Sequence, residues 1–402
     1  MAAQGDAKRT ILIAGATGLV GETALHRFAA LRGWEAIAVS RRAPEPAPGG
    51  RFRHVAVDLT DAEACRAAFG GLSEVTHVVY AALFEKPGLI AGWREADQMQ
   101  TNLAMLRNLM EPLTRASSGL KHVTLLQGTK AYGAHVKPNV PIPARERAPR
   151  DPHENFYWLQ EDYLRETARA RGFGWTIFRP QIVVGAAWGA AMNPLLAFGA
   201  YAAIRREEGR PFSYPGGVAQ VMELVDPRLL ARAFEWAAVE PGAAGEIFNI
   251  TNGDVFAWRE VWPAMAAAYG MEQGPDEPLR LAEYLPARAE IWDRIVQREG
   301  LRPLSLERFL GESHHYADAL LRMGVEAISQ PILVSTIKLR QAGFADCFDS
   351  EDTLRHWIEV MVDRKLIPAP GPSRPSTRAQ LSQEPSARPR SPAPAGPDPS
   401  AP

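Results

Sequence analysis

One short segment near the start of the chain constrains the fold more than any other feature. An apolar run of strand length, Thr10–Ala14, leads directly into a glycine-rich turn, and a helical pattern follows over Leu19–Leu31. Glycines let the backbone turn sharply, and the start of the helix presents free N–H groups and a positive dipole end to a bound phosphate. A strand, a GxxGxxG turn and a helix in this order are typical of a dinucleotide-binding sheet. We therefore expect pyrophosphate contacts from Gly15, Thr17, Gly18, Leu19, Val20 and Gly21.

The alternation of strand and helix continues through the first half of the chain. Apolar runs of strand length recur at Glu35–Val39, His54–Val57, His77–Tyr80, His122–Leu126 and Thr176–Arg179. Helical patterns lie between several of them, at Ala62–Phe69, Met99–Leu113 and Tyr157–Arg171. Buried strands that alternate with helices predict parallel pairing through right-handed crossovers. The expected fold class is α/β, with a Rossmann-type doubly wound parallel sheet over residues 1–180.

After residue 180 the pattern becomes mixed and mainly helical. Strand or helix patterns occur at Glu246–Ile250, Trp258–Tyr269 and Leu354–Val362. We expect residues 181–367 to form a smaller substrate-binding region, with the chain near 246–252 returning to the sheet. The last 35 residues, 368–402, hold 11 of the 33 prolines and almost no large apolar side chain, which predicts a disordered Pro-rich tail.

Composition argues against several kinds of partner and location. A net charge of −1 argues against a general nucleic-acid binder, which would normally carry a basic excess. Two cysteines are too few for a disulfide framework, and the polar N-terminus lacks the apolar core of a signal peptide, so we expect a cytoplasmic protein. The 25 residues 180–204 carry no charge, but their glycines and alanines argue against a membrane span.

Two arginines follow the second predicted strand. An NAD site usually has Asp or Glu here for the ribose 2′-hydroxyl, whereas the guanidinium fork of arginine matches a 2′-phosphate. Ser40, Arg41 and Arg42 therefore favour NADPH as the cofactor. The alternative is that the arginines only begin the polar loop 42–51.

Residues after the other strands are further candidates, because ligands bind at the carboxyl ends of parallel strands. Asp58 is placed to accept a hydrogen bond from an adenine amino group, and Thr60 or Asp61 beside it is a candidate cap for the next helix. The small Ala81 and Ala82 let the backbone pass near the cofactor. The remaining candidate contacts are Leu59, Tyr80, Gln127, Pro180, Ile182 and Val183.

These features together resemble the short-chain dehydrogenase/reductase superfamily. That superfamily usually has a tyrosine with a lysine four residues later, yet none of the nine tyrosines here has lysine at that spacing. Only seven of the 45 basic residues are lysines, and one of them, Lys130, follows the fifth predicted strand. A cation near a phenol strengthens the hydrogen bond that the phenol donates to a developing oxyanion. The alternative for Lys130 is a loop lysine without such a role.

Two segments carry a narrower resemblance. Residues 128–133 read GTKAYG and residues 155–162 read NFYWLQED. They resemble the lysine-containing and NFYY-containing segments of the progesterone 5β-reductase/iridoid synthase-like family, whose members are atypical short-chain reductases. The resemblance continues through residues 248–256 and ends near Ile367.

The resemblance implies an activity and its residues. In that family the lysine matching Lys130 and the tyrosine matching Tyr157 carry catalysis. The reaction is NADPH-dependent reduction of an activated carbon–carbon double bond, commonly that of an enone. Hydride goes to the β-carbon, Tyr157 supported by Lys130 stabilises the enolate, and the α-carbon later takes a proton, for which water is the expected source. We expect a small apolar enone as substrate, and the superfamily is compatible with a homodimer.

Some positions near this pair allow two interpretations. Trp158 replaces the second tyrosine of the family segment and points about 100° away from Tyr157 around the helix, so we interpret it as core packing. Glu161 either orients Lys130 or a neighbour, or is an exposed helix charge. The uncharged stretch 180–204 either lines an apolar pocket or forms a helix in the core.

Two other functions stay open at this point. One is an NAD(P)-dependent carbonyl reductase or epimerase of the extended short-chain type. The other is a non-enzymatic NADP-sensing regulator, against which the presence of Lys130 and Tyr157 argues. Metal chemistry is not expected, because the nine histidines form no HxxxH or HExxH pattern, and no GxSxG segment indicates a hydrolase.

Overall fold

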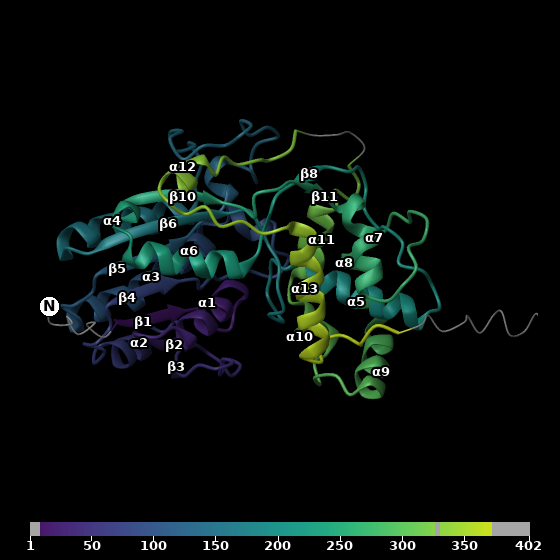
Figure 1. Cartoon of the computed structure of the whole chain (residues 1–402), viewed down its shortest axis with the longest axis horizontal. Helices are drawn as coiled ribbons and strands as arrows, with labels where there is room; N and C mark the ends of the chain where they lie inside the picture. Colours follow the sequence, from purple (N-terminus) through teal and green to yellow (C-terminus); the bar gives the residue numbers. More distant parts are fainter. Residues whose placement is uncertain (1–8, 326–329, 372–402) are drawn as a thin grey trace, which may run out of the picture.

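The computed structural model describes residues 9–325 and 330–371, and these form two adjoining bodies, one around a sheet and one mainly helical (Figure 1). The N-terminal body lies on the left of Figure 1 and the helical body on the right. Most of the tail predicted at 368–402 lies outside the described residues. The described chain runs past Ile367 to Gly371, and the Ala369 carbonyl accepts a hydrogen bond from Arg206 at 2.9 Å.

The sheet has seven strands in the order β10-β6-β5-β4-β1-β2-β3. Every neighbouring pair is parallel, which confirms the doubly wound Rossmann-type fold class. Each run of the first half that predicts a strand is a strand in the structure. The strands are β1 (Arg9–Ala14), β2 (Trp34–Ser40), β3 (Phe52–Ala56), β4 (His77–Tyr80), β5 (His122–Leu126), β6 (Gly174–Pro180) and β10 (Glu246–Ile250).

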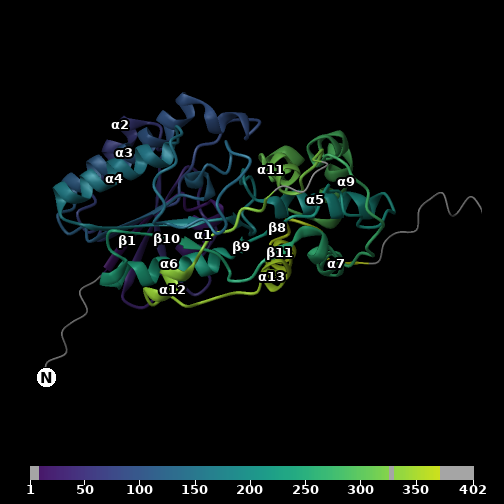
Figure 2. The same ribbon diagram turned by 90° about the horizontal axis from the view of Figure 1, so that it is seen from above.

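Helices cover both faces of the sheet, which is why its central strands are apolar on both sides. One face packs against α2 (Ala62–Phe69), α3 (Ala96–Ala116) and α4 (Phe156–Arg171). The other face packs against α1 (Leu19–Ala30) and α6 (Pro227–Val239), and the short α12 (Ile337–Gln341) lies beside β10. Figure 2 shows α2, α3 and α4 on one side of the sheet and α6 and α12 on the other.

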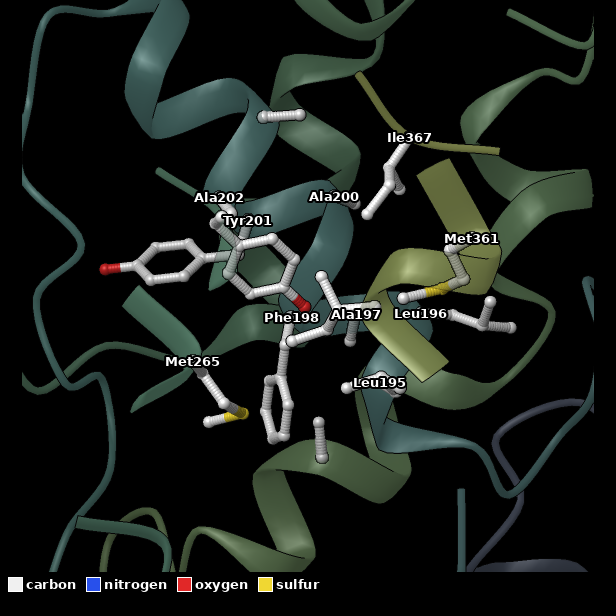
Figure 3. Packing of buried hydrophobic residues seen from close by; sticks show 14 of the residues in the cluster. Leu195, Leu196, Ala197, Phe198, Ala200, Tyr201, Ala202, Met265, Met361 and Ile367 are labelled. Atoms are coloured by element: carbon white, nitrogen blue, oxygen red, sulfur yellow. The ribbon is translucent and has the colours of Figure 1, made fainter. Parts of the chain in front are cut away.

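The second body is built around one buried helix, α5 (Pro194–Glu207), whose residues from Pro194 to Arg205 are all buried. A helix that is apolar all round must be covered on every side. Figure 3 shows side chains of α5 among Met265, Met361 and Ile367, which come from the surrounding elements. The core-helix interpretation of this part of the uncharged stretch is therefore the correct one. The surrounding helices are α7 (Trp258–Ala268), α8 (Leu281–Tyr284), α9 (Ala289–Glu299), α10 (Leu306–Leu310), α11 (Ser313–Leu320) and α13 (Ser350–Asp363).

Two small ladders lie outside the large sheet. They are β7 (Ile182–Val183) with β9 (Leu224–Val225), which is parallel, and β8 (Val221–Met222) with β11 (Phe256–Ala257), which is antiparallel. Short 3-10 turns complete the fold, at η1 (Ala91–Arg94), η2 (Thr129–Tyr132), η3 (Pro241–Ala243) and η4 (Pro286–Arg288). Among the described helices, none is both long and apolar enough to cross a membrane.

Candidate functional site

The glycine-rich turn between β1 and α1 is packed too tightly for any side chain at two of its glycines. A Cβ on Gly21 would lie 2.1 Å from the Gly15 carbonyl oxygen, and a Cβ on Gly15 would lie 2.7 Å from the Ala81 carbonyl oxygen. Gly15 also has a positive φ of 80°. The first N–H groups of α1 have no side-chain cap at Gly18, so they are free to bind an anion. This cradle of bare backbone fits a pyrophosphate.

The two arginines after β2 have different surroundings. The Arg41 side chain is 80% exposed and lies 3.9 Å from the Asp58 carboxylate. Arg42 instead stacks on the Trp188 ring at 3.6 Å and donates hydrogen bonds to the carbonyl oxygens of Thr17 and Trp188. Burial lowers the pKa of Arg42. Arg41 is therefore free to meet a ligand, whereas Arg42 is already engaged across the two bodies.

Asp58, at the end of the third strand segment, holds a tight turn. Its carboxylate accepts hydrogen bonds from the Thr60 amide at 3.0 Å and the Thr60 hydroxyl at 2.8 Å, and these bonds hold its pKa below the usual value. Asp61 caps α2 by accepting from two backbone N–H groups, so the capping role falls to Asp61. The neighbouring Leu59 is buried, and its carbonyl accepts from Asn108.

Tyr80 and Gln127 are buried, and their side chains contact groups in the protein interior. Tyr80 packs in the core beneath α2 and α3. The Gln127 amide donates to the Tyr157 carbonyl at 3.3 Å and to the Glu161 carboxylate at 2.9 Å, and it accepts from Arg179 at 2.8 Å. A cofactor contact from either residue would therefore have to come from its main chain.

Glu161 does not match either of its two sequence interpretations in full. Its side chain is 2% exposed, so it is not an exposed helix charge. It also does not reach Lys130, because its partners are Arg150, Arg165, Arg179 and Gln127. The pattern of charged residues along this helix does not indicate that Glu161 is buried. Glu161 instead fixes Gln127 below the ends of β5 and β6.

Tyr157 lies in the first turn of α4, with its hydroxyl directed at the ends of two strands. A Cβ on Gly128 would lie 3.2 Å from this hydroxyl oxygen and 3.3 Å from the Pro180 carbonyl oxygen. Within the described part of the chain, no group hydrogen-bonds the Tyr157 hydroxyl. Burial raises the pKa of Tyr157 above its usual value, with Glu85 as a further cause. The phenol therefore stays protonated and can donate a hydrogen bond.

Asn155 ties Tyr157 to Lys130. It caps α4 by accepting from the Tyr157 amide at 3.0 Å, and its amide donates to the Lys130 carbonyl at 3.1 Å. Ala131 packs in the same small apolar cluster as Tyr157. The helix carrying the tyrosine and the turn carrying the lysine are thus locked together, although the two residues are distant in sequence.

Lys130 lies in η2, just after β5, and its ammonium group is buried. It lies 3.5 Å from the Glu85 carboxylate and 3.8 Å from the centre of the Trp93 ring. Burial lowers the pKa of Lys130 to about 8. Sequence reasoning missed Glu85 and Trp93, which lie on the loop between β4 and α3. Their only signal is their place after a parallel strand, where ligands bind.

Two further groups of predicted residues lie at the same edge. Ile182 and Val183 form β7, directly after Pro180 ends β6. Trp158 is half-buried rather than fully in the core, and its indole donates to the His153 carbonyl at 3.1 Å. The glycine-rich turn, Asp58 and Lys130 follow the carboxyl ends of strands in the one sheet, and the Tyr157 hydroxyl lies beside Gly128 at the same edge.

Comparison with protein families gives a match over the sheet. The model of the NAD dependent epimerase/dehydratase family matches residues 11–251. Solved structures share the fold. A UDP-glucose 4-epimerase from Thermotoga maritima, solved with UDP-glucose, has a TM-score of 0.61 at 17% identity over 88% of this chain and 99% of its own. The Bordetella bronchiseptica enzyme WbmH, in complex with NAD+, has a TM-score of 0.60 at 17% identity over 89% and 99%.

Curated relatives match almost the whole chain. A 3-oxo-Delta(4,5)-steroid 5-beta-reductase from Arabidopsis thaliana is 31% identical over 377 residues, which cover 89% of this chain and 92% of the relative. An (S)-8-oxocitronellyl enol synthase from Camptotheca acuminata is 29% identical over 384 residues, covering 90% and 94%. A further enol synthase of the same name, from Nepeta cataria, is 29% identical over 379 residues, covering 89% and 91%.

Proposed function

The chain belongs to the NAD dependent epimerase/dehydratase family and, within it, to the progesterone 5β-reductase/iridoid synthase-like enzymes. From this membership and the geometry of the site, we propose that it is an oxidoreductase that reduces an activated carbon–carbon double bond of an enone at the expense of NADPH. The observation that carries the proposal is the link from Asn155 to both Tyr157 and Lys130. These two bonds join the main chains of the two residues, and so hold the helix that carries a protonated phenol beside the turn that carries a buried cation.

The residues at this edge fit a nicotinamide dinucleotide. The glycine cradle offers bare backbone and free helix N–H groups to a pyrophosphate, and Asp58 offers a carboxylate to the adenine. Bound there, NADPH would supply the hydride that the β-carbon of the substrate takes up. Pro180, Ile182 and Val183 follow β6 and would lie beside the nicotinamide end.

Each residue of the pair then has a defined task. Tyr157 donates a hydrogen bond from its phenol to the substrate carbonyl oxygen, on which negative charge builds as the enolate forms. Lys130 supplies positive charge near that oxygen, and its burial makes the charge act through a low-dielectric surrounding. The α-carbon finally takes a proton from water. Hydride chemistry comes from the cofactor, so the protein contributes orientation and electrostatic stabilisation.

We propose that the region 181–367 covers this site and forms its substrate pocket. The loop after β4 is joined to the helical body, because the Gly88 amide donates to the Glu312 carboxylate at 2.9 Å. Burial raises the pKa of Tyr157, and Tyr316 on α11 is a further cause, which supports an approach of α11 to the site. The exposed apolar residues Leu83, Ile90 and Val136 lie on loops that follow β4 and β5 and suit a small apolar substrate.

We propose that Arg41 recognises the 2′-phosphate of NADPH. Arg41→Ala is expected to raise the KM for NADPH about tenfold, the effect of losing one charge-assisted hydrogen bond at an exposed position, and to leave the KM for NADH unchanged. Steady-state kinetics with each cofactor measures this. Arg51→Ala, on the same exposed loop, is the matched control and should behave as the wild type. Equal use of NADH and NADPH by the wild type would contradict the assignment.

A further inference from the structure

A buried carboxylate faces Lys130 from the loop between β4 and α3. The Glu85 side chain is 4% exposed and the Lys130 side chain 11% exposed, and Glu85 Oε1 lies 3.5 Å from Lys130 Nζ. The other carboxylate oxygen of Glu85 accepts a hydrogen bond from Gln98 Nε2 at 2.7 Å. Gln98 is itself buried and fixed to the loop through the Lys86 amide at 3.0 Å. Glu85 is therefore held in place by α3, the first helix after the loop.

Besides Glu85, the Trp93 ring contacts the Lys130 ammonium group. Within the described residues, Lys130 Nζ has no hydrogen-bond partner. The Trp93 ring lies under it at 3.8 Å, and a cation over an aromatic face is attracted to the ring. By contrast, Lys86 on the same loop is largely at the surface and pairs with Glu95 and Asp97. Lys130 is thus fixed by one carboxylate and one ring, and its N–H groups stay available.

We propose that Glu85 is a positioning residue that holds the Lys130 ammonium group on Trp93 and keeps it charged while the enolate forms. The proposal rests on the proposed function, because it assigns Glu85 a task only through Lys130. The 3.5 Å separation is longer than a hydrogen bond. A pair at this distance attracts without consuming the N–H groups that Lys130 needs for Tyr157 and the substrate.

The charges around the pair give the direction of its pH dependence. Burial lowers the pKa of Lys130 to about 8, and Glu85 opposes this change, so loss of the carboxylate lowers that pKa further. Burial raises the pKa of Glu85, and Lys130 opposes that change. The other titratable groups nearby are His135 beside Lys130, Tyr157 beside Glu85, His153 beside the Lys130 main chain, and Arg179 and Tyr316 beside Tyr157. Burial lowers the pKa of both histidines and raises that of both tyrosines, so these four are uncharged near pH 8. Arg179 donates to Gln127.

The test is the pH profile of kcat for NADPH oxidation with a simple enone. Activity of the wild type should fall as pH rises through about 8, where Lys130 loses its proton. Glu85→Gln should lower kcat and move this alkaline limb about one pH unit toward acid, the effect expected when an opposite charge at this distance is removed. Glu85→Asp should restore the position of the limb with a lower kcat. Glu95→Gln, a surface carboxylate on the same loop, should match the wild type.

A second measurement separates positioning from a general loss of structure. If Glu85 acts through Lys130, then adding Glu85→Gln to a Lys130→Met protein should change kcat by less than about twofold. Multiplying losses in the double variant, or an unmoved alkaline limb in Glu85→Gln, would overturn the proposal. The double variant also provides the test if Glu85→Gln alone does not fold, because it removes both buried charges together. A wild type that does not consume NADPH with any enone would refute the proposed function instead, which is a separate outcome.

Discussion

Replacing Tyr157 by phenylalanine is expected to lower kcat for enone reduction by about 10²–10³-fold, the usual effect of removing one hydrogen-bond donor to a developing oxyanion. The substitution removes only the hydroxyl, which lies beside Gly128 and the end of β6 and has no hydrogen-bond partner within the described chain. The packing of the ring with Phe156 should therefore persist. Steady-state kinetics gives kcat, and fluorescence titration of NADPH gives the cofactor Kd, which should not change.

The matched control for this change is Tyr163→Phe. Tyr163 lies six residues later on the same helix and its ring stacks with Arg107, away from the strand ends. Its variant should keep wild-type kcat. Full activity in Tyr157→Phe would show that another group carries the enolate hydrogen bond.

Replacing Lys130 by methionine is expected to have an effect of similar size. The variant keeps an unbranched apolar side chain of similar length, and removes the charge that lies over Trp93 and stabilises the enolate. We expect a fall in kcat of about 10²-fold or more, because the lost interaction is electrostatic and buried. The alkaline limb near pH 8 should disappear with the ammonium group that causes it.

Lys137→Met supplies the comparison, since Lys137 belongs to the same loop and pairs with Asp151. Its activity should equal that of the wild type. The Lys130→Met protein should also keep its affinity for NADPH, because neither the glycine cradle nor Arg41 touches the lysine in this structure. A loss of cofactor binding together with catalysis would instead assign Lys130 to the cofactor site.

Local chemistry made much of the fold predictable. The pattern at 62–69 predicts α2 with its observed bounds, because Asp61 is a good capping residue and Gly70 follows the last turn. The glycine-rich turn was predictable for a similar reason, since its spacing leaves room for backbone contacts that a Cβ would prevent. Apolar runs predict the strands of the sheet because both of its faces are covered by helices.

The rest depends on contacts between residues far apart in the chain. Arg42 stacks on Trp188, 146 residues away, so no local pattern could separate it from Arg41. Glu85 and Trp93 lie between β4 and α3, Trp93 in the short turn η1, and only the three-dimensional path of this segment brings them to Lys130. The sequence left two interpretations of Glu161 open, and only the structure shows that it is buried and pairs with Arg150 and Arg165. Long-range packing, not local propensity, decides each of these cases.

Reduction at the double bond is tested by the identity of the product that forms when the protein oxidises NADPH with a simple enone. Gas chromatography with mass spectrometry distinguishes a saturated ketone, reduced at the double bond, from an allylic alcohol, reduced at the carbonyl. With NADPH deuterated at the transferred position, we expect a saturated ketone with deuterium on the β-carbon. An allylic alcohol with deuterium on the carbinol carbon would contradict it and would favour a carbonyl reductase.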